Sequence, residues 1–149
     1  MTDHKIIIEP GPLELMCQHA EAAFPFECCG FMYGQEDGER LITLAVPVEN
    51  SKEGDQRRRF EISPLEYMKA ERFAIENQLQ LLGVYHSHPD HPAIASQHDL
   101  AVAMPYFSYI IISVINKKRA DIKSWQLNDG ERGFAEESVL SQTGTPMLV

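Results

Sequence analysis

The residues with the clearest chemical potential lie in one short segment of the chain. His86 and His88 are two positions apart and precede Pro89. If this segment forms a strand, both imidazoles point to the same face, since side chains alternate between the two faces. Ser96 and Asp99 follow at the start of an expected helix and are neighbours on one of its faces. Two imidazoles and one carboxylate could therefore meet at a single metal ion.

This set of ligands has a specific chemical meaning. Two histidines and one carboxylate leave a tetrahedral Zn²⁺ with one open position for water, which is typical of catalytic rather than structural zinc sites. The same residues also have a structural interpretation. A histidine pair can simply belong to the packed strand, and a serine N-cap with an acid three positions later is an ordinary helix start. Spacing alone does not decide between the two.

A second acidic residue of interest lies far upstream, in the segment from Pro25 to Gly30. Glu27 stands there between the end of an expected helix and an apolar strand. An acid in an apolar stretch is costly to bury unless it has a partner or a function. The alternative is a solvated loop position.

Together, the two segments closely resemble the signature of the JAMM (MPN-plus) metalloproteases. That signature contains Pro-x-Glu-x-Cys-Gly, then His-x-His-Pro, and then Ser-x-x-Asp, with seven residues between the second histidine and the serine. The sequence matches it at Glu27, His86, His88, Ser96 and Asp99. The resemblance spans roughly residues 6–125. Its one visible departure is Ala95, where many relatives have proline, and this change removes no ligand.

The resemblance implies a role for each matched residue. His86, His88 and Asp99 would bind one zinc ion, Glu27 would carry a proton from water to the leaving amine, and Ser96 would stabilise the oxyanion. The implied activity is hydrolysis of a peptide or isopeptide bond. The expected partner is the C-terminal Gly-Gly tail of a ubiquitin-like or sulfur-carrier protein, as for the compact bacterial members of the family.

Three other functions could use a similar set of residues. A non-catalytic MPN scaffold typically loses ligands that this sequence retains. A zinc nucleobase deaminase needs a Cys-x-x-Cys pair, which the sequence lacks. A passive metal-binding module would hold zinc without turnover. The cysteines have no context for a nucleophile, and His91 and His98 are expected to be ordinary loop and helix residues.

The elements that would position these residues can be predicted from periodicity and from helix-capping signals. Helices are expected over residues 13–23, 64–77 and 96–104. Strands are expected over residues 5–9, 31–33, 41–48, 60–62, 81–88, 109–115, 120–127 and 132–140, with 120–127 near an edge. This mixture without strict alternation predicts one α+β domain, a single mixed sheet flanked by helices. The resemblance adds a three-layer arrangement similar to that of cytidine deaminases.

The remaining expectations concern the whole chain. One domain is expected over residues 1–149, with a flexible tail over 141–149. The net charge of −9 disfavours nucleic acid as a partner. The three cysteines do not form a disulfide framework, and no membrane span or signal peptide is recognisable, so a cytoplasmic location is expected. The arginines at 57–59 are expected on a solvated loop face. Residues 50–59 could form a mobile loop that contacts substrate or an ordinary connection, and the oligomeric state, a homodimer included, stays open.

Overall fold

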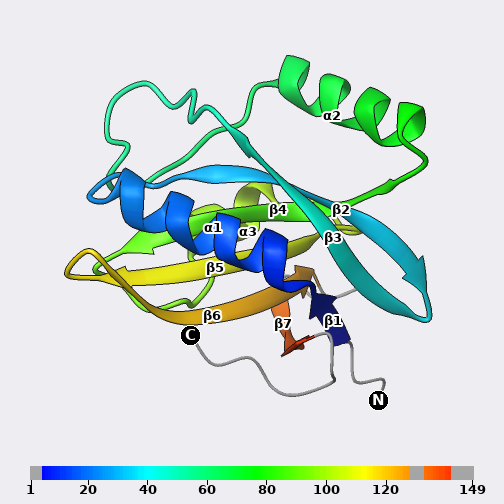
Figure 1. Cartoon of the computed structure of the whole chain (residues 1–149). Coiled ribbons are helices and arrows are strands. Elements are labelled where there is room, and N and C mark those ends of the chain that lie inside the picture. Colours follow the sequence, from blue (N-terminus) through cyan, green and yellow to red (C-terminus); the bar gives the residue numbers. More distant parts are fainter. Residues whose placement is uncertain (1–4, 128–132, 142–149) are drawn as a thin grey trace.

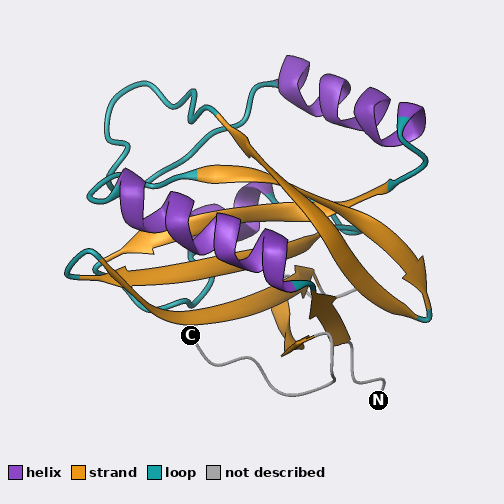
Figure 2. Cartoon of the chain, in the orientation of Figure 1, coloured by secondary structure: helices purple, strands orange, loops and turns teal. Residues whose placement is uncertain are grey.

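The computed structural model describes residues 5–127 and 133–141. Its strands are β1 (Lys5–Ile8), β2 (Cys29–Asp37), β3 (Glu39–Val48), β4 (Gln80–Pro89), β5 (Ser108–Ile115), β6 (Lys118–Leu127) and β7 (Phe134–Ser141). Its helices are α1 (Pro10–Ala23), α2 (Pro64–Glu76) and α3 (Gln97–Val102) (Figures 1 and 2). No helix in this described part combines the length and apolar character needed to cross a bilayer.

The sheet is mixed, as predicted, but it closes on itself. The strand order is β1-β3-β2-β4-β5-β6-β7, and β1 pairs in parallel with both β3 and β7. The β4–β5 pair is also parallel, whereas the other neighbours are antiparallel. The prediction of an edge position for residues 120–127 is wrong, because β6 lies between β5 and β7. The resemblance to cytidine deaminases stays a prediction.

Two apolar cores cover the two faces of the sheet. On one face α1 buries Met16, Cys17 and Ala20 against strand residues such as Tyr85. On the other face α2 buries its small residues Ala70 and Ala74. Figure 1 shows the two helices on separate sides of β2 and β4. The central strands are therefore buried on both faces, and any polar side chain on them must find a partner inside the molecule.

The segment at residues 60–62 is not the short strand that the sequence predicts. Its hydrogen bonds go to the loop that follows β3. The Ser51 backbone N–H donates to the Glu61 carbonyl at 2.9 Å, and the Glu61 N–H donates to Asn50 Oδ1 at 3.1 Å. The loop at residues 49–63 is therefore closed by its own polar groups.

The helices begin largely where the capping signals predict. Ser63 caps α2, and its side chain accepts from the Glu66 N–H. Ser96 caps α3, but this helix ends at Val102, earlier than predicted. The N–H of Met104, just beyond α3, donates to the Tyr109 hydroxyl rather than to a helix carbonyl. The tail expected to be flexible lies outside the described residues, except Ser141, which belongs to β7.

Candidate metal centre

His86 and His88 lie on the buried end of β4, between β2 and β5, and their imidazoles face one another. The two Nε2 atoms are 3.2 Å apart. Nδ1 of His88 is 2.8 Å from the Pro92 carbonyl, and only a protonated Nδ1 can donate to that oxygen. This contact fixes the tautomer that leaves the Nε2 lone pair free for a metal. The ring of Phe60 stacks on His86 with centroids 4.4 Å apart, which holds the second imidazole in place.

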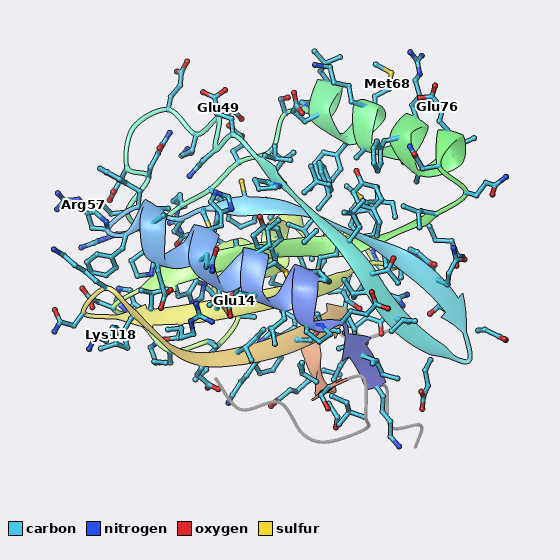
Figure 3. The ribbon with its side chains drawn as sticks, in the orientation of Figure 1. Glu14, Glu49, Arg57, Met68, Glu76 and Lys118 are labelled. Carbon is cyan, nitrogen blue, oxygen red and sulfur yellow. The ribbon has the colours of Figure 1, made fainter. Side chains whose placement is uncertain are left out.

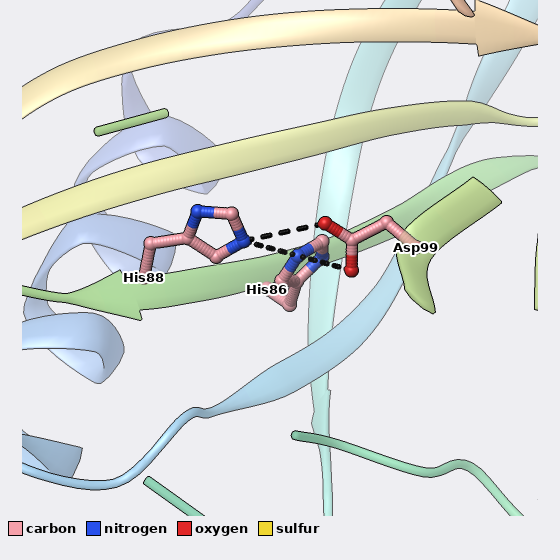
Figure 4. Close-up of side chains that lie close together, drawn as sticks. All are labelled: His86, His88 and Asp99. Carbon is pink, nitrogen blue, oxygen red and sulfur yellow. Dashed lines mark hydrogen bonds and ion pairs between the residues drawn. The ribbon is translucent and has the colours of Figure 1, made fainter. Parts of the chain in front are cut away.

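Asp99 reaches the same point from the first turn of α3, as Figure 4 shows. Its Oδ1 is 3.3 Å from Nε2 of His86, and its Oδ2 is 3.3 Å from Nε2 of His88. Asp99 also completes a capping box, because Oδ2 accepts from the Ser96 N–H while Ser96 Oγ accepts from the Asp99 N–H. The pair is therefore both a helix cap and part of the cluster, because the capping bonds place the Asp99 carboxylate beside the two imidazoles.

The spacing of the three side chains fits a small tetrahedral ion. Bonds of about 2.0–2.1 Å from zinc to nitrogen and oxygen put neighbouring ligand atoms about 3.3–3.4 Å apart. The distances of 3.2, 3.3 and 3.3 Å among the three groups are close to these expected separations. Within the described residues these three side chains form the one grouping of metal-ligand type. The chemistry of the donors and their separation both suit zinc.

The charges of the cluster favour a cation. Burial alone would raise the pKa of Asp99, but hydrogen bonds from both imidazoles hold it well below its usual range. Burial lowers the pKa of His86. Burial also acts to lower the pKa of His88, but its contacts with Asp99 and the Pro92 carbonyl outweigh that effect and raise it. The metal-free site is thus an ionised carboxylate beside an imidazole that readily holds a proton, and a metal would displace that proton.

Glu27 lies near this cluster, in the loop between α1 and β2, with only 7% of its surface exposed. Burial raises the pKa of its carboxyl to about 8, and the charge of His88 acts in the opposite direction. Its backbone is held firmly, because its N–H donates to the Gln56 carbonyl at 2.7 Å and its carbonyl accepts from Asn50 Nδ2 at 3.1 Å. The predicted acid in an apolar stretch is therefore buried rather than solvated.

A groove of about 520 Å³ opens over the site. It is lined by Glu27, Arg58, Arg59, His88, His91, Pro92, Ile94 and Ser96. Because Ser96 Oγ accepts the Asp99 N–H, its own hydroxyl proton remains available to donate to a group in the groove. A carbonyl bound here would meet a ligand imidazole, a buried carboxyl group and a hydroxyl donor together.

Several other polar residues do not join the cluster. His98 lies beside Phe60 and Met104 in a separate cavity of about 200 Å³. Cys28 and Cys29 are buried, and burial raises the pKa of their thiols to about 11 and about 12, so neither is a ready nucleophile. Trp125 donates from Nε1 to the Ala93 carbonyl and so supports the loop after β4.

Two positioning residues were not predicted from the sequence. The backbone N–H of Cys28 donates to Ser87 Oγ at 2.9 Å, and the Ser87 N–H donates to the Cys28 carbonyl, which fastens the Glu27 loop to the strand of the histidines. Asn50 holds Glu27 and Arg59 through one amide group. The available signal for Ser87 was a hydroxyl inside a strand that is expected to be buried, since such a group needs a partner there. The sequence offers no comparable signal for Asn50.

Comparison with known proteins adds an independent observation. Residues 12–128 match the model of the family described as prokaryotic homologs of the JAB domain. The chain is 30% identical to a desampylase of Pyrococcus furiosus over 108 residues, covering 69% of this chain and 68% of that protein. It is 25% identical to a CysO-cysteine peptidase of Mycobacterium tuberculosis over 130 residues, which cover 87% of each protein.

Solved structures show the same fold. A solution structure of a Desulfitobacterium hafniense protein superposes with a TM-score of 0.80 at 31% identity, covering 92% of both chains. A JAB1/MPN domain protein of Archaeoglobus fulgidus gives a TM-score of 0.55 at 17% identity, covering 91% of this chain and 96% of that one, which is a likeness of fold alone.

Proposed function

The chain belongs to the family of prokaryotic homologs of the JAB domain, and from that premise we propose that it is a zinc-dependent peptidase. Its substrate would be the extended C-terminal Gly-Gly tail of a ubiquitin-like or sulfur-carrier protein. The observation that carries the proposal is the placement of a buried Glu27 and the Ser96 hydroxyl in one groove over the His86–His88–Asp99 cluster. The names of the relatives, a desampylase and a CysO-cysteine peptidase, support the choice of substrate class.

Each side chain has a chemical task in this proposal. His86, His88 and Asp99 would hold the metal beside the groove that His88 lines. Zinc bound there supplies a Lewis acid that makes hydroxide available near neutral pH. Glu27 accepts a proton from the attacking water at its carboxylate and passes it to the leaving amine. Ser96 donates its hydroxyl proton to the oxyanion on the substrate carbonyl, an interaction worth about 3 kcal/mol in comparable sites.

The raised pKa of Glu27 suits such a shuttle. A base that must also act as an acid works best with a pKa close to the working pH. Burial is the largest cause that raises the pKa of Glu27 to about 8, and the nearby charges of His88 and Arg59 act to lower it. A neighbouring Zn²⁺ would favour the carboxylate and lower this value toward neutrality.

The test combines metal content with turnover in two proteins. Zinc per chain is measured in the wild type and in Glu27→Ala after purification with sufficient metal, and both are assayed on a sulfur carrier with a C-terminal extension beyond Gly-Gly. We expect zinc in both proteins and cleavage by the wild type alone. A wild type without zinc would refute the metal site, and zinc without cleavage of any carrier would refute the substrate class.

A further inference from the structure

The groove beside Glu27 has a basic wall that the proposed chemistry does not use. Arg58 and Arg59 line it, although the chain as a whole carries a net charge of −9. Arg58 lies 3.8 Å from Asp55, which partly neutralises it. Arg59 makes no ion pair within the residues that the structure describes. An exposed, uncompensated guanidinium beside a catalytic groove is suited to an anion that arrives with the substrate.

The backbone of Arg59 is tied to the candidate machinery on both sides. Its carbonyl accepts from Asn50 Nδ2 at 3.1 Å, and the same NH₂ group donates to the Glu27 carbonyl at 3.1 Å. The next residue, Phe60, stacks on His86. The charge of Arg59 acts to lower the pKa of Glu27, in keeping with their closeness. The backbone position of Arg59 relative to Glu27 and His86 is therefore set by the fold.

We propose that Arg59, assisted by Arg58, binds the free α-carboxylate of the residue that is cleaved from the Gly-Gly end. This inference rests on the proposed function and specifies its substrate: a carrier whose extension ends at the residue after Gly-Gly, rather than an isopeptide. In such a substrate the carboxylate carbon lies two bonds, or about 2.5 Å, from the scissile nitrogen. A lysine joined through its side chain has no carboxylate so close to the scissile nitrogen.

The chemical step balances with water as the only co-reactant. The C–N bond after Gly-Gly breaks, the oxygen of water joins the glycine carbonyl carbon, and the proton held by Glu27 goes to the leaving nitrogen. The products are a carrier ending in a Gly-Gly carboxylate and a free amino acid. During this step the leaving carboxylate lies near Glu27 and Asp99, and Arg59 offsets the repulsion among these negative groups.

The test uses a matched pair of substrates and a matched pair of variants. The substrates are a carrier ending in Gly-Gly-Cys with a free carboxylate and the same carrier with a C-terminal amide. The variants are Arg59→Gln and Arg57→Gln. Arg57 does not line the groove, its guanidinium lies 5.8 Å from the Phe26 ring centroid, and Figure 3 shows it at the outer edge of the loop. Zinc content is measured in every protein to verify that the site is intact.

We expect the wild type to cleave the acid at least about tenfold faster than the amide, measured as kcat/KM. Arg59→Gln should lose about tenfold on the acid and little on the amide, whereas Arg57→Gln should retain the wild-type preference. Equal wild-type rates on acid and amide would overturn the inference. An equal loss on both substrates in Arg59→Gln would also overturn it.

A binding measurement separates this inference from the proposed function. Zinc-loaded Glu27→Gln is titrated with the acid and amide forms, alone and combined with Arg59→Gln. If the wild type cleaves neither form, the proposed function fails. A preference for the acid in binding that Arg59→Gln removes would still support carboxylate recognition, and equal binding of acid and amide would refute it.

Discussion

The burial of Glu27 suits its proposed role as a base but lowers the stability of the folded protein at high pH. Glu27 is only 7% exposed, and burial raises the pKa of its carboxyl to about 8, whereas the same group in an unfolded chain would have a pKa near the ordinary value of 4.5. Between these two pH values the folded, metal-free protein retains a proton that the unfolded chain has released. Its stability therefore falls as the pH rises from about 4.5 to about 8, and the loss is complete above that range.

Glu27→Gln should remove this pH dependence. In metal-free protein we expect the variant to be more stable than the wild type at pH 8.5 by about 1–4 kcal/mol, with a much smaller difference at pH 5. Urea unfolding of both proteins in the presence of a chelator, at the two pH values, measures the effect. A variant that is equally stable or less stable than the wild type at pH 8.5 would contradict the raised pKa of this buried carboxyl.

Ser96 serves both the α3 cap and the groove, and two variants can separate these roles. Ser96→Ala removes the hydroxyl, and we expect kcat to fall about 100-fold and stability to fall by about 1 kcal/mol. Ser96→Thr retains a cap acceptor and a hydroxyl donor, so most of the activity should return. Steady-state kinetics together with zinc content distinguishes the outcomes. A normal kcat in a zinc-loaded Ser96→Ala protein would exclude the oxyanion role.

The sequence indicated some residues of the site far better than others. Glu27, His86, His88, Ser96 and Asp99 could be identified because their order and spacing follow a specific signature, and the structure brings all five to one groove and the cluster beneath it. Other contributors come from the loop that follows β3, where no periodicity marks a position. The significance of Arg59 and Asn50 appears only when the chain folds and one amide meets two distant carbonyls.

At the scale of elements, the loop at residues 49–63 connects three parts of the site. It contacts the proposed base Glu27 and the candidate ligand His86, and it carries the arginines that line the groove. Asn50 donates to the carbonyls of Glu27 and Arg59 and accepts from the N–H groups of Lys52 and Glu61. Gln56 adds bonds to the carbonyls of Asn50 and Lys52. The loop therefore acts as a hydrogen-bonded bracket, although most of residues 51–59 are exposed.

Asn50→Ala should loosen this bracket without touching the metal. The substitution removes two hydrogen bonds that the Asn50 side chain donates and two that its oxygen accepts. We therefore expect the free energy of unfolding to fall by about 1–3 kcal/mol and kcat/KM to fall about tenfold, with normal zinc content. Ser51→Ala is the matched control, because its hydroxyl donates only to the Glu61 carbonyl in the same loop. Wild-type kinetics in Asn50→Ala would show that the bracket does not position the reacting groups.

The elements themselves were predicted unequally, for a physical reason. Periodicity located α1, α2 and most strands, because each buries an apolar face that is visible in the sequence. The same periodicity does not specify which strands pair. The barrel closes through the pairing of β1 with β7, whose residues are more than a hundred positions apart in the sequence. The interior position of β6 depends on its pairing with β7. The non-strand at residues 60–62 likewise follows from contacts with Asn50 and Ser51.

At the scale of the whole molecule, the candidate centre joins parts that otherwise share few contacts. His86 and His88 belong to the buried β4 at the middle of the sheet, and Asp99 belongs to the short helix α3. A metal between them would cross-link the barrel to the segment that carries Ser96. Because the cluster needs the folded chain to assemble, an ion that binds it must stabilise the fold through mass action.

Zinc should therefore raise the melting temperature, and variants of the three candidate ligands should lose this increase. At a free zinc concentration 100 times the Kd, the stabilisation is about 2.7 kcal/mol, which corresponds to about 5–10 °C for a domain of this size. Asp99→Asn retains an acceptor for the Ser96 N–H but loses the charged ligand and its contacts with the imidazoles, so its metal-free melting temperature should fall below the wild-type value and its zinc response should shrink as well. Glu27→Gln should keep the full response, since Glu27 is not among the clustered ligands. Thermal scans of the three proteins, with chelator and with zinc, measure this directly. If zinc raised the melting temperature of Asp99→Asn as much as that of the wild type, the metal would bind elsewhere. Only an ion bound by His86, His88 and Asp99 makes the zinc-induced gain in stability depend on the Asp99 carboxylate.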